Sequence, residues 1–102
     1  MLGVDIVNIP EFSKQITSGG ETFLNKTFLP NELEDRNPEH LAGIFAAKEA
    51  VMKTLNLPAG SWQQIEIINS PRPRASVGGG QKVEISISHH VDYAVAIALE
   101  LS

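Results

Sequence analysis

The segment Tyr93–Leu101 constrains the fold more than any other part of the sequence. Its residues alternate between two faces, with small residues on one face (Ala94, Ala96 and Ala98) and bulky apolar residues on the other (Tyr93, Val95, Ile97, Leu99 and Leu101). Such alternation is typical of a β-strand, because successive side chains point to opposite faces of a sheet. Small residues on one face allow a helix to pack closely against it. The segment therefore predicts a strand with a helix against its alanine face.

The longest predicted helix runs from about Glu39 to Leu55. The sequence Asn37-Pro38-Glu39 is a typical helix start, and Asn56 and Pro58 end the pattern. At about 100° per residue one stripe of the helix is apolar. Its members are Leu41, Ile44, Val51, Met52 and Leu55, with Phe45 at the edge and Lys48 near the middle.

The other predicted elements are shorter. Strands are expected where β-branched residues or alternation dominate, and helices where Pro or Glu marks a first turn. The expected strands are Leu2–Val7, Gln64–Asn69 and Lys82–Ser88; the expected helices are Pro10–Thr17, before Gly19-Gly20, and Glu21–Lys26, with another helix start at Pro30. Pro71, Pro73 and the run Gly78-Gly79-Gly80 are expected to break the chain between the last two of these strands.

Length and composition favour one domain over residues 1–102, with a modest core. Hydrophobic residues make up 42% of the chain, and a domain of this size gains from oligomerisation. A net charge of −4 argues against a broad nucleic-acid-binding surface. The absence of cysteine excludes disulfides and thiolate metal sites and fits a reducing compartment. The apolar N-terminal stretch is too short for a signal peptide or membrane span, so a soluble cytoplasmic protein is expected.

Two carboxylates lie inside apolar stretches, Asp5 in Gly3–Val7 and Glu49 in Phe45–Ala50. An unpaired charge in such a setting is costly and usually has a partner, which could be a metal ion. A simpler interpretation of Glu49 is a surface ion pair with Lys53 four residues later. Lys48 could extend its ammonium outward from the apolar stripe, or the lysines on either side of Glu49 could gather a metal-bound phosphate.

A second polar cluster, Ser86–His90, is predicted at a strand end before the strand at Tyr93. Side chains at such a place can reach a ligand, although a polar hairpin turn with outward-facing serines is the simpler interpretation of this cluster alone. With Asp92 the two histidines weakly resemble a metal site or a Ser/His/Asp triad, but no zinc spacing or nucleophile elbow is present. Arg72 and Arg74 suit either phosphate binding or a solvated loop.

Three segments in order resemble the signature segments of the phosphopantetheinyl transferases, of the small holo-acyl-carrier-protein synthase type. They are Gly3–Val7, Phe45–Ala50 with Lys53, and Ser86–His89. The resemblance extends to residues between the first two segments, Phe23, Lys26, Thr27, Phe28 and Glu32, and so covers most of the chain.

The resemblance implies transfer of the phosphopantetheine arm of coenzyme A to a serine of an apo acyl carrier protein, with release of adenosine 3′,5′-bisphosphate. It implies Mg²⁺ held by Asp5, Glu49 and the pyrophosphate, and magnesium does favour such oxygen ligands. Lys53 would contact phosphate and support the leaving group, while Lys48 would bind phosphate or brace the site. Ser88 and His89 would face the adenylate. The serine proton would pass to Glu49 or to a metal-activated water.

The implied fold is α+β, a long helix packed on a small, mostly antiparallel sheet. The implied assembly is a homotrimer with an active site at each subunit interface. The acceptor would be a carrier of fatty acid, polyketide or another pathway, with no nucleic acid or membrane partner.

The sequence departs from the family at three places. Ile44 replaces a frequent arginine, His90 replaces a small hydroxyl residue, and the segment Asn69–Gln81 is short. Two alternatives remain open, and the missing arginine and the short segment motivate the first of them. One is a non-catalytic oligomer that binds coenzyme A or a nucleotide, and the other is a metal-dependent phosphate-ester hydrolase using Asp5 and Glu49.

Overall fold

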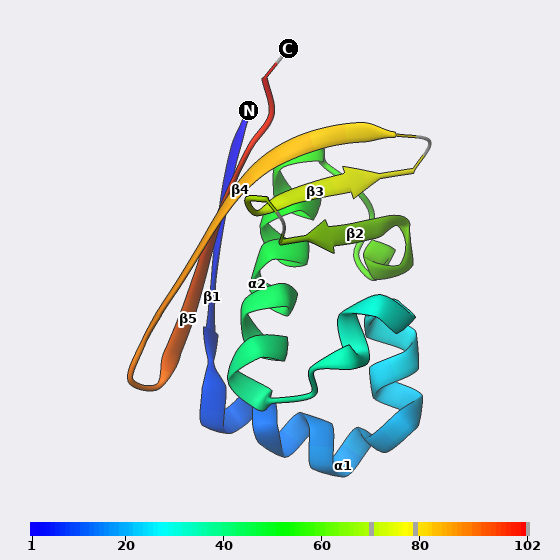
Figure 1. The fold of residues 1–102 in the computed structure, drawn as a ribbon, viewed down its shortest axis with the longest axis vertical. Coiled ribbons are helices and arrows are strands. Elements are labelled where there is room, and N and C mark those ends of the chain that lie inside the picture. The colour runs from blue at the N-terminus through cyan, green and yellow to red at the C-terminus, as the bar shows by residue number, and fades with distance from the viewer. Residues whose placement is uncertain (70, 79, 102) are drawn as a thin grey trace.

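The computed structural model describes residues 1–69, 71–78 and 80–101, and in them two α-helices pack against an antiparallel sheet (Figure 1). The sheet order is β1-β5-β4-β3-β2, and every neighbouring pair is antiparallel. The predicted α+β architecture is confirmed. The elements are β1 (Leu2–Asn8), α1 (Ile9–Thr27), the 3₁₀ turn η1 (Pro30–Glu34), α2 (Pro38–Leu55), the 3₁₀ turn η2 (Ser61–Gln64), β2 (Ile65–Ile68), β3 (Arg74–Val77), β4 (Gln81–His90) and β5 (Tyr93–Leu99).

Helix α2 lies along the inner face of the sheet, as the alternation in the last strand predicts. Ala94, Ala96 and Ala98 are fully buried beneath it. On β1, Gly3 pairs with Ala98, and a Cβ at Gly3 would overlap Ala50 O and Thr54 Oγ1 of α2. The small residues of the two strands therefore allow the helix backbone to approach the sheet closely.

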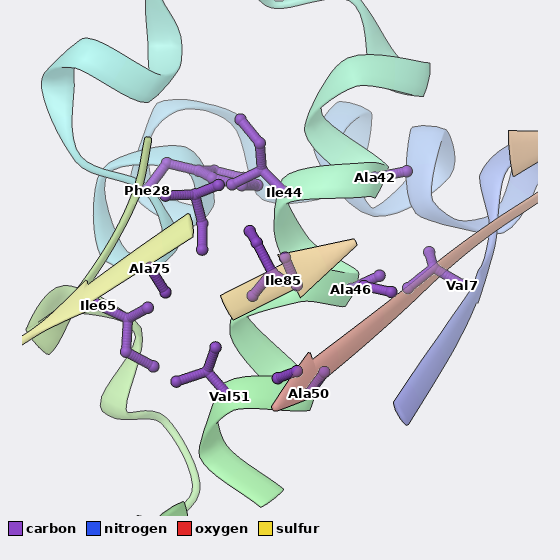
Figure 2. Close-up of a cluster of buried hydrophobic side chains, with 14 of the residues drawn as sticks. Val7, Phe28, Ala42, Ile44, Ala46, Ala50, Val51, Ile65, Ala75 and Ile85 are labelled. Atoms are coloured by element: carbon purple, nitrogen blue, oxygen red, sulfur yellow. The ribbon is translucent and has the colours of Figure 1, made fainter. Parts of the chain in front are cut away.

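The hydrophobic core fills the space between α2, the sheet and the α1 segment (Figure 2). Because α1 and η1 cover the side of α2 that faces away from the sheet, α2 is buried over more of its surface than one apolar stripe predicts. Asn37 accepts a hydrogen bond from Glu39 N at the start of α2, and Asn56 ends the helix in the left-handed region.

The N-terminal helical region differs from its prediction. The helices expected at Pro10–Thr17 and Glu21–Lys26 are both present, but they join into α1. Only Gly20, at φ 59° and ψ −151°, departs from helical geometry and kinks the helix. Asn8 accepts a hydrogen bond from Glu11 N and so starts α1 directly after β1.

The sequence analysis did not predict β3. This four-residue strand follows Pro73, where a break was expected, and its Ala75 and Val77 side chains are buried. Gly79 of the glycine run and Ser70 of the short segment lie outside the described residues.

The cluster Ser86–His90 is also placed differently, because β4 continues to His90. Its histidines are part of the strand rather than of a turn, since the register pairs His89 with Ala94 and His90 with Tyr93. Ile87 and His89 share the inner face with the alanines of β5, and Ser86, Ser88 and His90 lie on the outer face.

The outer face of β1 and β5 is apolar and exposed. Its large side chains include Leu2, Val4, Ile6, Tyr93, Ile97 and Leu99, with Ile6 at 61% exposure. No helix among the described residues is long and apolar enough to cross a membrane.

Candidate active site

Asp5 lies on the inner face of β1, opposite Ala96, with its side chain only 16% exposed. Lys53 of α2 donates to Asp5 Oδ1 and to the carbonyl oxygen of Val4, both at 3.0 Å. Among the described residues, Lys53 therefore pairs with Asp5 and not with Glu49 as expected. The Lys53–Asp5 ion pair joins α2 to β1. This contact brings two residues from the first and second motifs together.

Glu49, one turn before Lys53, is half-buried and accepts a hydrogen bond from Trp62 Nε1 at 2.8 Å. Asp5 and Glu49 line one cavity of about 450 Å³ between β1, α1 and α2. We call this cavity the carboxylate pocket; its other lining residues are Ile6, Val7, Asn8, Glu11, Phe12, Gln15 and Phe45.

The carboxylate oxygens of the carboxylate pocket are suitable ligands for a magnesium ion that takes its remaining ligands from a substrate and water. No group of three or more His, Cys, Asp or Glu side chains in the described part of the chain could hold a metal on its own. Mg²⁺ is usually bound by one or two carboxylates together with phosphate oxygens and waters. Asp5 and Glu49 supply two such carboxylates in one cavity.

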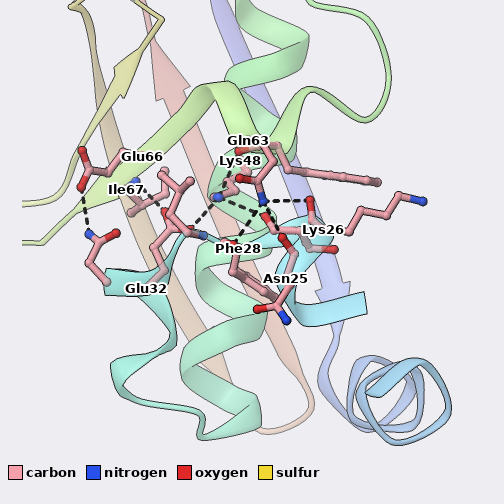
Figure 3. Close-up of polar contacts among 12 residues, drawn as sticks. Asn25, Lys26, Phe28, Glu32, Lys48, Gln63, Glu66 and Ile67 are labelled. Carbon is pink, nitrogen blue, oxygen red and sulfur yellow. Dashed lines mark hydrogen bonds and ion pairs between the residues drawn. The ribbon is translucent and has the colours of Figure 1, made fainter. Parts of the chain in front are cut away.

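Lys48 lies next to Glu49 in sequence but points into the core, where its side chain is fully buried. Its Nζ lies 2.6 Å from Glu32 Oε1 and donates to the carbonyl oxygens of Thr27 and Trp62, both at 3.1 Å (Figure 3). Burial lowers the pKa of Lys48, and the charge and hydrogen bond of Glu32 oppose that shift. Of the two roles expected for Lys48, this buried position favours structural support of the site over phosphate binding.

The buried partner of Lys48 was not identified from sequence. Glu32 was noted only as part of a resembling segment, yet its carboxylate also accepts hydrogen bonds from Leu29 N and Ile67 N, both at 2.8 Å. The available signal was the position of Lys48 in the middle of an apolar stripe, because an ammonium that stays buried there needs an acid or carbonyl partners.

A second cavity, of about 430 Å³, lies between α2, β4 and the segment before β3. We call it the histidine pocket; it is lined by Asp35, Asn37, Glu39, His40, Gly43, Ile44, Asn69, Pro73, Ile87 and His89. His89 Nε2 lies 3.3 Å from Glu39 Oε1. Ser88 lies on the opposite face of β4, so the structure does not bring it into this pocket with His89.

The two pockets lie on opposite sides of α2. Phe45 and Glu49 face the carboxylate pocket, whereas Gly43 and Ile44 line the histidine pocket. Asp5 and Ile87 mark the same separation across the sheet, because β5 lies between their strands and both pair with Ala96. Within one chain, the structure assembles Asp5, Glu49 and Lys53 and places His89 apart from them.

Comparison with known proteins identifies the family of the chain. The family model of the 4′-phosphopantetheinyl transferase superfamily matches residues 1–98. The chain belongs to this superfamily. Among its members, the holo-[acyl-carrier-protein] synthase of Dehalococcoides mccartyi strain CBDB1 is 39% identical, over 95% of this chain and 94% of its own length. That of Coprothermobacter proteolyticus is 40% identical, over 96% of this chain and 92% of its own.

Solved structures of superfamily members share the fold. The holo-[acyl-carrier-protein] synthase of Helicobacter pylori in complex with coenzyme A aligns with a TM-score of 0.89 at 31% identity, over 97% of this chain and 98% of that one. The synthase of Bacillus anthracis, in complex with CoA (3′,5′-ADP), aligns with a TM-score of 0.80 at 29% identity, over 95% and 91%.

Proposed function

We propose that this chain is a holo-acyl-carrier-protein synthase, which transfers phosphopantetheine from coenzyme A to a serine of an apo acyl carrier protein. The observation that carries the proposal is that Asp5 and Glu49 line one cavity while Lys53 pairs with Asp5, in a chain whose relatives carry that activity in their names. Two carboxylates can bind the metal ion, and a lysine can bind the negatively charged pyrophosphate.

In the proposed reaction, the serine hydroxyl gives its proton to Glu49 or to a water, and the serine oxygen bonds to the phosphorus that bears pantetheine. The bond from that phosphorus to the bridging oxygen breaks, and adenosine 3′,5′-bisphosphate leaves with the bridging oxygen. Asp5 and Glu49 would hold Mg²⁺, which when bound offsets the charge of the pyrophosphate. Lys53, more than half exposed and only 3.0 Å from Asp5, is close enough to contact a phosphate oxygen there and support the leaving group.

The separated pockets support a site shared between chains. His89 is expected to face the adenylate, yet α2 lies between its pocket and the carboxylate pocket of the same chain. The exposed apolar face of β1 and β5 offers a surface that a second copy of the chain would cover. We therefore propose a homotrimer of one-domain chains, with each site completed by a neighbour, working in the cytoplasm.

Intact-mass analysis tests the activity directly. Apo carrier proteins incubated with coenzyme A, Mg²⁺ and this chain should gain one phosphopantetheine group, and chelation of the metal should prevent the gain. Coenzyme A binding without any mass gain on several carriers would favour the non-catalytic alternative. Release of free phosphopantetheine from coenzyme A, with the carrier unmodified, would favour the hydrolase.

A further inference from the structure

The single tryptophan of the chain contacts a residue of the proposed metal site. Trp62 lies in η2, and its indole Nε1 donates to Glu49 Oε2 at 2.8 Å. Its ring packs on Phe45, one turn before Glu49, with ring centroids 6.0 Å apart and planes inclined by 33°. The packing holds the ring on the surface of α2, so the N–H is directed at the carboxylate.

The backbone of Trp62 is also fixed by hydrogen bonds. The buried ammonium of Lys48 donates to the Trp62 carbonyl oxygen at 3.1 Å and is itself fixed by Glu32 (Figure 3). The next residue, Gln63, donates from Nε2 to the carbonyl oxygens of Asn25, Lys26 and Phe28, at 2.8, 3.1 and 3.2 Å. Turn η2 is thus tied to both α2 and the end of α1.

Two consecutive residues of α2 therefore hold the same residue of η2 through different groups. Lys48 binds the carbonyl of Trp62, and Glu49 accepts from its indole. A glutamate side chain has several rotatable bonds, and fixing one carboxylate oxygen restricts where the other can point. Glu49 Oε2 is held by the indole, which leaves Oε1 to turn toward the carboxylate pocket.

We propose that Trp62 is a positioning residue that sets the orientation of the Glu49 carboxylate for metal binding, and that the buried Lys48–Glu32 pair fixes Trp62 in turn. This inference rests on the proposed function, because it takes Glu49 as a metal ligand. Partners that orient metal ligands from behind typically contribute roughly 10–100-fold to metal affinity or activity. The same order of effect is expected for the indole N–H.

The sharpest variant replaces Trp62 by benzothienylalanine, which keeps the shape of the indole but has sulfur in place of the N–H. Binding of Mn²⁺ in the presence of coenzyme A, followed by electron paramagnetic resonance, should weaken about 10-fold relative to wild type. The Mg²⁺ concentration for half-maximal transfer should rise by a similar factor, while the melting temperature stays close to that of wild type. Trp62→Phe should weaken Mn²⁺ binding at least as much.

Ser61→Ala serves as the matched control in the same turn. Ser61 donates from its hydroxyl to the Pro58 carbonyl at 2.6 Å rather than to Glu49, so loss of this hydroxyl should leave Mn²⁺ affinity unchanged. A general loosening of η2 would instead weaken binding in this variant as much as in the benzothienylalanine variant, which would overturn the proposal.

The emission of Trp62 provides a second readout in the unmodified protein. The indole of Trp62 is hydrogen-bonded to Glu49. Mg²⁺ added with coenzyme A should therefore change the fluorescence of Trp62, and Glu49→Gln should remove that change. Unaltered Mn²⁺ affinity in the benzothienylalanine variant would overturn the positioning role whether or not carriers are modified. A wild-type chain that binds Mn²⁺ and coenzyme A without modifying carriers would overturn the proposed transfer alone, since the ratio of affinities still tests Trp62.

Discussion

At the scale of single residues, the site combines one side chain from β1 with two from consecutive turns of α2. Asp5 and Lys53 already contact each other, and Glu49 is held from the other side by Trp62. A metal entering between the carboxylates would compete with Lys53 for Asp5. The lysine is more than half exposed, so it can move to a phosphate oxygen at little cost.

Asp5→Asn and Glu49→Gln should each lower turnover by more than the roughly 10–100-fold typical of residues that only orient a ligand. Each substitution removes a carboxylate but almost no volume. The melting temperature should therefore change little, because a partly exposed ion pair contributes at most about 1 kcal/mol. Carrier modification at saturating Mg²⁺, measured beside thermal unfolding, checks both expectations. Near-normal turnover in either variant would rule that residue out as a metal ligand.

The histidine pocket leads to a prediction about affinity for coenzyme A. Among its lining residues there are two acids and two histidines, and no lysine or arginine. Ile44 is only 2% exposed, so Ile44→Arg should lower the melting temperature, because part of a charged side chain then replaces core volume. If the long side chain carries its guanidinium into the pocket, the KM for coenzyme A should fall about 10-fold, since a charge-assisted hydrogen bond to phosphate contributes roughly 1.5–3 kcal/mol. Ile44→Met is the uncharged control and should leave KM unchanged.

Dephospho-coenzyme A separates charge recognition from packing in this experiment. If the new arginine binds the 3′-phosphate, KM for the dephospho substrate should stay at the wild-type value in Ile44→Arg. Equal gains for both substrates would instead place the arginine near the pyrophosphate.

The candidate site residues that the sequence predicts are those that break a hydrophobic pattern. Asp5 and Glu49 stood out because each is an acid in an apolar stretch, and Lys48 because it interrupts the stripe of α2. Trp62 did not stand out, since an aromatic residue in a short turn is explained by packing alone. Its contact with Glu49 depends on how η2 folds back over α2, which no local periodicity encodes.

At the scale of elements, α2 packs between the sheet and the α1 segment. The predicted match between α2 and the alanines of the last strand is confirmed by their complete burial. The sequence did not predict β3, because Pro71 and Pro73 suggested a loop and the strand has only four residues. At Gly19-Gly20 the sequence predicted an interruption between two helices, whereas the structure continues the helix through Gly19 and only Gly20 adopts a positive φ, which glycine does without the penalty of a Cβ.

Gly3→Ala should destabilise the fold by about 1–3 kcal/mol, the usual cost of adding a methyl group to a well-packed core. The new methyl group would overlap the Ala50 carbonyl of α2, and the backbone cannot move away as a side chain can. Chemical denaturation measures the change. Ser86→Ala, on the exposed outer face of β4, is the control and should unfold like wild type. An unchanged midpoint for Gly3→Ala would mean that β1 lies farther from α2 than described.

Lys48→Met should destabilise the fold by about 3–5 kcal/mol, because it leaves the buried carboxylate of Glu32 without its cation. The double variant Lys48→Met with Glu32→Leu removes both charges and should recover part of the loss, although Leu29 N and Ile67 N then lose their acceptor. Equilibrium denaturation of the three proteins measures the differences. A loss below 1 kcal/mol in the single variant would argue against a charged buried pair.

The Lys48–Glu32 pair should also make the free energy of unfolding depend on pH. The pKa of Lys48 is lowered from 10.5 by burial, so between the lowered value and 10.5 the unfolded chain binds more protons than the folded one. The contribution of Lys48 to the free energy of unfolding should therefore rise with pH through that window. Comparison with Lys48→Met at each pH isolates this contribution from other alkaline titrations.

At the scale of the whole molecule, the proposed homotrimer would cover the exposed apolar face of β1 and β5 and would complete a site from two separated pockets. If the face forms the subunit contact, Ile97→Lys should shift sedimentation from trimer to monomer and reduce carrier modification with it. Ser18→Lys, exposed on α1, adds the same charge elsewhere and should remain trimeric. A fully active monomer would rule out the shared site.

Mixed assemblies test whether Asp5 and His89 of one site come from different chains. Asp5→Ala and His89→Ala subunits, each inactive alone, should recover part of the activity when they assemble together, because some sites then receive both intact residues. A stable mixed trimer without recovery would assign both residues to the same chain, or would show that His89 is dispensable.

The position of α2 between the two pockets also has a kinetic consequence. If no single chain can complete a site, the number of working sites depends on how many chains are associated, and association depends on concentration. Specific activity should then fall when the enzyme is diluted below its dissociation constant, and the rate should rise more steeply than in proportion to total enzyme. A cell could therefore change carrier modification more than proportionally by a small change in how much of this chain it makes.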